Sequence, residues 1–175
     1  AFFRFLEAER GSITIDGIDI ASIALATLRQ RLTIIPQDAQ LFGGTIRSNL
    51  DPFGVYDDGD MWFALKRCRL AISGDCPGST APHSPVQSLD DIVEQNGANL
   101  SAGQRQLLAL ARGLLKMRDS RLLLLDESTA NLDTESDAFI QRTLREQMSP
   151  GTTLLTVAHR LRTICLLYTS DAADD

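Results

Sequence analysis

Apolar residues gather in short runs along the chain, and three of these runs are typical of strands. Four consecutive leucines, Leu122–Leu125, predict a strand that is buried on both faces, as in a parallel sheet. Thr152–Val157 is a second run of this buried type. Leu32–Ile35 is a shorter, β-branched run that stops at Pro36, which favours an extended conformation before it and a loop after it.

Alternating apolar and polar residues in Ser12–Ile20 predict two antiparallel strands. Asp16 and Gly17 lie inside this stretch, and this dipeptide is a strong signal for a tight hairpin turn. We expect a helical turn at Leu25–Gln30. Ala1–Leu6 is mostly apolar, and we expect it to be the last part of a helix.

Helical spacing of apolar residues predicts longer segments from Thr45 to about Leu70, after Asn99–Gln106, and from Thr134 to about Met148. In the first segment the residues near one face are Met61, Leu65 and Cys68. In the other two they are Leu107, Leu110, Ala111, Leu114 and Leu115, and then Ile140, Leu144 and Met148. Between the first two segments, Ser73–Asp90 is rich in Gly, Pro and Ser and predicts a mobile surface insertion.

Composition narrows the class of protein. The 175 residues are 43% hydrophobic and 23% charged, which is ordinary for one globular domain with a core. The formal net charge of −6 does not favour a nucleic-acid surface. Three cysteines without a C-x-x-C pair indicate free thiols in a reducing compartment. No run approaches the roughly 18 apolar residues of a membrane span, so we expect any membrane association to come through a partner or through residues outside this chain.

The leucine strand ends at two adjacent carboxylates, Asp126 and Glu127. Successive strand side chains point to opposite faces, so the two acids serve different purposes. The end of a strand in an open α/β sheet is where ligands bind. One acid suits a Mg²⁺ held with nucleotide phosphates, and the other suits polarising a water for attack. The alternative is that the pair merely ends a strand and opens a turn.

Polar residues at two other element ends are further candidates. Ser101 is a natural N-cap with Gln104 three residues later, which predicts a capping box. The same helix start, with Ser101 and Gly103, also offers backbone donors and a hydroxyl to a phosphate, and spacing does not separate these alternatives. His159 comes just after the second buried strand and becomes a candidate phosphate sensor if that strand neighbours Asp126 and Glu127.

These residues occur in an order that resembles the nucleotide-binding domain of ATP-binding cassette (ABC) proteins. Gln37 within IIPQDAQLFGG resembles the Q-loop glutamine, and LSAGQ at residues 100–104 resembles the signature motif. LLLLDE, STANLD and TVAHR are similar to the Walker B motif with its following glutamate, the D-loop and the switch-histidine loop. The phrase GTIRSNLDPF is most similar to the second such domain of subfamily C, the multidrug-resistance-associated exporters.

The resemblance implies a role for each matching residue, with ATP and Mg²⁺ as cofactors. Asp126 would hold Mg²⁺ through water, and Gln37 would complete the metal shell. Glu127 would be the general base, and His159 would contact the γ-phosphate. Residues that would serve the partner's nucleotide or couple the two sites are Ser101, Gly103, Gln104 and Asp133.

The implied fold class is α/β, a P-loop NTPase-like (ABC ATPase) core with a small antiparallel β piece and an α-helical subdomain, incomplete at both ends. We expect residues 1–46 and 120–164 to form the ATPase core and residues 47–119 the helical subdomain. Residues 165–175 resemble translated sequencing-adaptor text, the alternative being a divergent natural terminus. Neither Lys66 nor Lys116 follows a glycine, so the P-loop pattern G-x-x-x-x-G-K-[ST] is missing. The chain is therefore expected to be an N-terminally truncated fragment that does not hydrolyse ATP alone.

For the parent protein, the resemblance implies an ATP-driven exporter at the cytoplasmic face of a plasma or vacuolar membrane. Its partners would be a second nucleotide-binding domain, in a head-to-tail ATP sandwich, and the transmembrane domains of the same transporter, with no nucleic acid. One alternative is a soluble ABC-type ATPase of DNA repair or chromosome maintenance, although the short distance between Gln37 and Ser101 leaves no room for a coiled-coil arm. Another is a non-catalytic fragment that lends its signature face to a partner.

Overall fold

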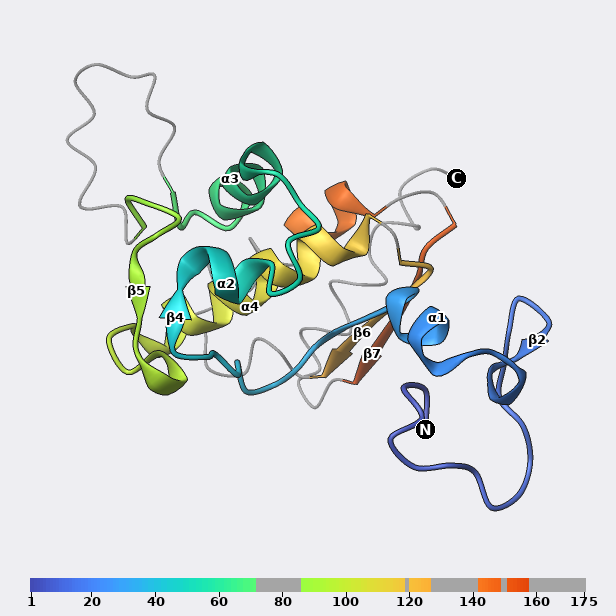
Figure 1. Ribbon diagram of the computed structural model, residues 1–175. Coiled ribbons are helices and arrows are strands. Elements are labelled where there is room, and N and C mark those ends of the chain that lie inside the picture. Colours follow the sequence, from blue (N-terminus) through green and yellow to red (C-terminus); the bar gives the residue numbers. More distant parts are fainter. Residues whose placement is uncertain (72–85, 119, 127–141, 149–150, 158–175) are drawn as a thin grey trace, which may run out of the picture.

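The computed structural model describes residues 1–71, 86–118, 120–126, 142–148 and 151–157 (Figure 1). Its elements in chain order are β1 (Thr14–Ile15), β2 (Ile18–Asp19), η1 (Ile20–Ser22), α1 (Leu25–Gln30), β3 (Leu32–Ile35), β4 (Gly44–Thr45), α2 (Ile46–Leu50), α3 (Asp58–Arg67), β5 (Ile92–Val93), η2 (Gln95–Gly97), α4 (Ala102–Met117), β6 (Leu122–Asp126) and β7 (Thr153–Val157). Residues 142–147 are also helical.

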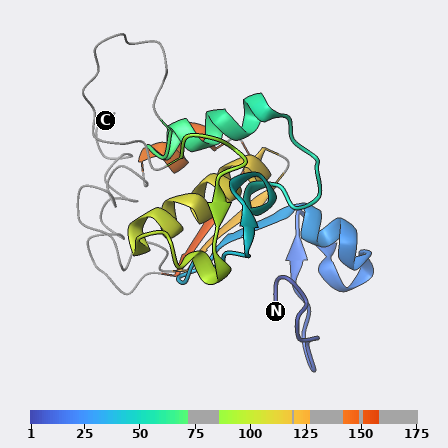
Figure 2. The same ribbon diagram turned by 60° about the vertical axis from the view of Figure 1, so that its left-hand side comes forward.

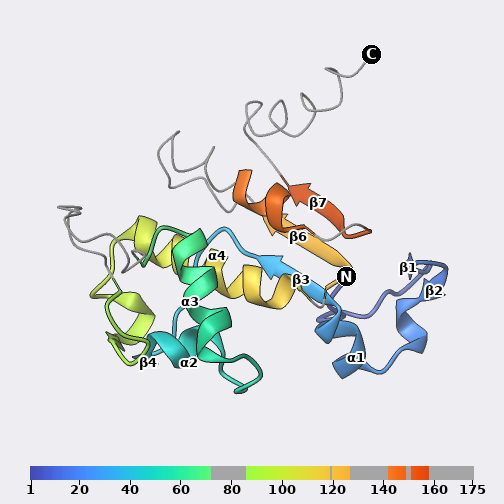
Figure 3. The same ribbon diagram turned by 90° about the horizontal axis from the view of Figure 1, so that it is seen from above.

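The central sheet consists of β3, β6 and β7, which run parallel in that spatial order (Figure 3). All three strands were predicted from the apolar runs, but β7 is not buried on both faces, since its residues alternate between exposed and half-buried. The prediction is wrong there because β7 is the terminal strand of this order within the described chain. It therefore has a neighbour, β6, on one side only.

Helix α4 covers one face of the sheet, and α3 packs on the other side of α4 (Figure 2). The close approach to β3 depends on Gly113, where a Cβ atom would lie 2.8 Å from Cγ1 of Ile35. Leu110, Ala111, Leu114 and Leu115 are buried here, as helical spacing predicted. The apolar face of α4 thus packs in one core cluster with residues of β3, β6, α2 and α3.

The segment predicted to be helical from Thr45 to about Leu70 forms two helices, α2 and α3, rather than one. The interruption is at Asp51, whose buried carboxylate accepts hydrogen bonds from the backbone nitrogens of Phe53 (3.3 Å) and Tyr56 (2.7 Å). These bonds stabilise a loop, because a side-chain acceptor offers the backbone an alternative to helical bonds. The predicted apolar face is confirmed, since Met61, Leu65 and Cys68 are all buried.

The predicted surface insertion, Ser73–Asp90, is described only in its last five residues, 86–90, and there the prediction is wrong. Val86 and Leu89 are buried in the main core. The carboxylate of Asp91 folds this part inward by accepting hydrogen bonds from the backbone nitrogens of Gln87 (2.7 Å) and Ser88 (2.9 Å). Residues 73–85 lie outside the described residues.

The N-terminal hairpin is confirmed, with β1 and β2 antiparallel. Asp16 (φ 52°) and Gly17 (φ 78°) both have positive φ, which is the requirement of a type I′ turn. Residues 1–6, in contrast, are not helical. Arg4 has a φ of 48°, and its nitrogen closes a turn by donating to the carbonyl of Ala1 at 2.8 Å. Phe3, which lies inside this turn, packs into a second core cluster.

The remaining sequence predictions fall partly outside the described chain. Of the helix expected from Thr134 to Met148, residues 142–147 are helical and Leu144 is buried. Residues 165–175 are not described, and the division into core and helical subdomain stays a prediction. In the described ranges, no helix has both the length and the apolar character needed to cross a bilayer.

Candidate functional site

The carboxyl ends of the three parallel strands meet at one edge of the sheet. Ile35, the last residue of β3, pairs with Leu125, and Asp126 pairs with Val157 at the end of β7. Asp126 is therefore one step beyond the last pair of β3 with β6. Gln37 is two residues beyond the end of β3 and is exposed. The register thus brings two predicted site residues, Gln37 and Asp126, to the same edge.

This edge suits a magnesium-bound nucleotide on chemical grounds. Open α/β sheets bind ligands beyond the carboxyl ends of their strands. Mg²⁺ takes oxygen ligands and is commonly held through one or two carboxylates together with phosphates and waters. The carboxylate of Asp126 and the amide oxygen of Gln37 are donors of that kind. Glu127, Asp133 and His159 lie outside the described residues, so their roles stay predictions.

The start of α4 contains the predicted capping box. Ser101 Oγ accepts a hydrogen bond from the Gln104 nitrogen at 3.1 Å, and Gln104 Oε1 accepts one from the Ser101 nitrogen at 2.8 Å. The hydroxyl hydrogen of Ser101 is not used by this arrangement. The backbone nitrogens of Ala102 and Gly103 belong to the first turn, whose amides have no acceptor within the helix. A phosphate role for Ser101 and Gly103 is therefore compatible with the cap.

Helix α4 also contacts the loop that carries Gln37. Gln106 is buried, and its Nε2 donates a hydrogen bond to the carbonyl oxygen of Pro36 at 3.3 Å. Sequence reasoning did not select this residue. The available signal was its position, since Gln106 shares the apolar face of Leu110 and Leu114 at helical spacing. A polar residue at such a position needs a partner, and here the partner is the backbone next to Gln37.

The chain is similar to known transport proteins. A family model described as ABC transporter matches residues 1–130. The pleiotropic ABC efflux transporter of multiple drugs YBT1 of Candida glabrata is 48% identical over an alignment of 175 positions, which covers 94% of this chain and 10% of that protein. The ATP-binding cassette sub-family C member 3 of Homo sapiens is 51% identical over 162 residues, which cover 93% of this chain and 10% of that protein.

A solved structure supports the same assignment. The structure of a bacterial Atm1-family ABC exporter with ATP bound matches with a TM-score of 0.76 and 34% sequence identity, over 93% of this chain and 27% of that one. The chain thus spans about a tenth of the length of the curated relatives it matches. It belongs to the ABC transporter family and forms part of a nucleotide-binding domain of the subfamily C kind.

Proposed function

We propose that this chain is the nucleotide-binding part of an ATP-driven exporter, in which ATP binding and hydrolysis drive transport through transmembrane segments. The observation that supports the proposal is the strand register, in which Asp126 lies one step beyond the end of β3, and Gln37 follows that end by two residues. Open parallel sheets bind ligands at such an edge. The name of the Candida glabrata relative includes efflux and the similar solved structure is of an exporter, which favours an exporter over the soluble DNA-repair alternative.

The residues at this edge have complementary roles in the proposal. Asp126 and Gln37 would hold Mg²⁺, which when bound neutralises negative charge on the nucleotide phosphates. Glu127 directly follows Asp126 in sequence and would accept a proton from the attacking water. His159, two residues after the end of β7 in sequence, would donate a hydrogen bond to the γ-phosphate. Phosphoryl transfer depends mainly on this kind of positioning and charge neutralisation.

The start of α4 would face the nucleotide of a second, head-to-tail domain. Ser101 would donate its hydroxyl hydrogen, Gly103 would offer a backbone amide, and Gln104 would keep Ser101 in place through the capping box. Asp133 would couple the two sites. The transmembrane domains would belong to the same transporter and place this chain at the cytoplasmic face of a plasma or vacuolar membrane.

A phosphate-release assay tests the proposal on two proteins, the 175-residue chain and the same chain extended at its N-terminus by the family's phosphate-binding loop. We expect turnover only in the extended protein, because the pattern G-x-x-x-x-G-K-[ST] does not occur in these residues. Glu127→Gln in the extended protein should abolish release while ATP still binds. Turnover by the 175-residue chain, or full turnover by Glu127→Gln, would overturn the proposed roles.

A further inference from the structure

Arg112 lies in the middle of α4 and reaches from the helix to two other segments. Its Nε donates to the carbonyl oxygen of Asn49 at 2.6 Å, its Nη1 to the carbonyl oxygen of Gln40 at 3.1 Å, and its Nη2 to Oδ1 of Asn49 at 3.2 Å. Burial lowers the pKa of Arg112. Within the described chain its acceptors are neutral oxygens, two backbone carbonyls and one side-chain amide, so this guanidinium forms neutral-acceptor hydrogen bonds rather than an ion pair.

Asn49 connects the same guanidinium to the end of the loop between β3 and β4. Its side chain is 1% exposed. Oδ1 accepts a hydrogen bond from the Phe42 nitrogen at 2.9 Å, and Nδ2 donates to the carbonyl oxygens of Phe42 (2.8 Å) and Thr45 (3.0 Å). The guanidinium of Arg112 also lies 5.8 Å from the centroid of the Phe42 ring. Phe42 is thus held through its backbone and its ring.

Together with Gln106, these contacts fix the loop of residues 36–43 to α4 at three places. Gln106 holds the carbonyl of Pro36 at the start, Arg112 holds that of Gln40 in the middle, and Arg112 with Asn49 holds Phe42 near the end. Gln37 lies between the first two of these places and is itself exposed. Its position relative to α4 is therefore set by bonds made by its neighbours.

We propose that Arg112 is a positioning residue that makes the Gln37 loop and α4 move as one unit, with Asn49 as its main partner. α4 begins at the Ser101 cap, so a shift of this cap also moves Gln37. The hydrogen bonds between α4 and the Gln37 loop stay the same during this movement. The inference rests on the proposed function for the roles of Gln37 and Ser101. Arg112 does not contact the reacting groups in this account.

Amide hydrogen exchange on the 175-residue chain tests the structural half. In Arg112→Ala the amides of residues 38–43 should exchange about tenfold faster or more, while α3 and β6 keep their wild-type rates, because local openings are independent of global unfolding. Arg112→Lys should show a smaller increase, since an ammonium cannot form the same planar fork of bonds. Wild-type exchange in the loop, or equal acceleration in every element, would overturn the proposal.

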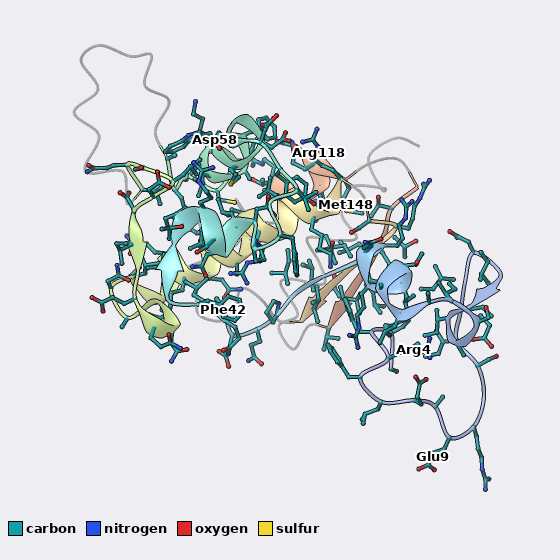
Figure 4. All side chains as sticks on the ribbon, viewed as in Figure 1. Arg4, Glu9, Phe42, Asp58, Arg118 and Met148 are labelled. Atoms are coloured by element: carbon teal, nitrogen blue, oxygen red, sulfur yellow. The ribbon has the colours of Figure 1, made fainter. Side chains whose placement is uncertain are left out.

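Arg118→Ala is the matched control at the C-cap of the same helix. Arg118 follows α4 at its C-terminal end and pairs with Asp60 of α3, well away from Phe42 (Figure 4). Its side chain is 62% exposed, and exposed ion pairs contribute little to stability. We expect loop exchange in this variant to equal that of the wild type. Faster loop exchange in Arg118→Ala would show that losing any side-chain contact of α4 raises the exchange rate of the loop amides, and it would refute a specific role for Arg112.

ATP hydrolysis by the complete transporter tests the functional half. Arg112→Ala should lower kcat about tenfold and leave KM for ATP within about twofold, because a displaced Gln37 leaves the other proposed Mg²⁺ ligand, Asp126, in place, whereas charge neutralisation during phosphoryl transfer needs both ligands. Arg112→Lys should fall between Ala and wild type. If Arg112→Ala speeds exchange in the loop but keeps the wild-type kcat, the positioning role is rejected and the proposed function stays intact. No hydrolysis by the wild-type transporter would reject the proposed function, while the exchange result would still decide whether the loop is fixed by Arg112.

Discussion

Replacing Asn49 by alanine removes the amide that closes the loop between β3 and β4. The variant loses three neutral hydrogen bonds, to the Phe42 nitrogen and to the carbonyls of Phe42 and Thr45, and one bond from the Arg112 guanidinium. A neutral bond contributes about 1 kcal/mol net, and a bond to a charged group about 1.5–3 kcal/mol. Phe42 is exposed, so water recovers part of this loss. We therefore expect the free energy of unfolding to fall by about 2–4 kcal/mol.

Urea unfolding measures this loss, with an unchanged m-value as the sign that the same surface is exposed in both proteins. Asn99→Ala is the matched control, because its side chain also bridges backbone groups, the Glu94 nitrogen at 3.0 Å and the Ile92 carbonyl at 2.8 Å, but is exposed. We expect this variant to lose less than about 1 kcal/mol. Equal losses in the two variants, or a loss below about 1 kcal/mol at Asn49, would refute the argument that burial makes the Asn49 bonds strong.

Three further predictions concern other buried or paired groups. Thr33 Oγ1 and Ser120 Oγ are buried 2.5 Å apart, so Thr33→Val should lower the free energy of unfolding in urea by about 1 kcal/mol in the wild type and by little in a Ser120→Ala background. Equal losses in the two backgrounds would show that the pair is not coupled. The Arg47 guanidinium, hydrogen-bonded to Asp58, holds the pKa of that carboxyl below its usual 3.8; the stabilisation is present above that value and lost as pH falls through the folded pKa. Arg47→Gln should therefore raise the Asp58 pKa in an NMR titration, and an unchanged pKa would contradict the pairing. Burial raises the pKa of the Cys68 thiol, so in a variant whose other cysteines are serine we expect thiol reagents to react only after unfolding; rapid reaction of the folded chain would show that Cys68 is accessible.

Elements with local signals could be predicted closely from the sequence. The Asp16–Gly17 turn, the strand that ends before Pro36, and the Ser101 cap of α4 each depend on residues within a few positions of one another. Such signals act on the backbone directly, through the positive φ of a turn, the restriction before proline, and the capping of free amides.

The remaining features depend on contacts that are distant in sequence or on a single buried acceptor. Helical spacing did not reveal the break between α2 and α3, because it is stabilised by the Asp51 carboxylate. The fixing of the Gln37 loop joins Asn49 to Arg112, which are 63 residues apart. Motif order selected the candidate site residues, but the register that places Asp126 one step beyond the end of β3 came from the structure.

The central claim is that a magnesium-bound nucleotide lies at the carboxyl edge of β3, β6 and β7. Paramagnetic broadening by Mn²⁺ with ATP tests it most directly, because the effect decreases steeply with distance from the metal. In the chain extended by the phosphate-binding loop, we expect the strongest broadening at the amides of Gln37, Asp126 and Val157, and none at Asp58 at the start of α3. Broadening at Asp58 as strong as that at Gln37, or its absence at Asp126, would contradict the account.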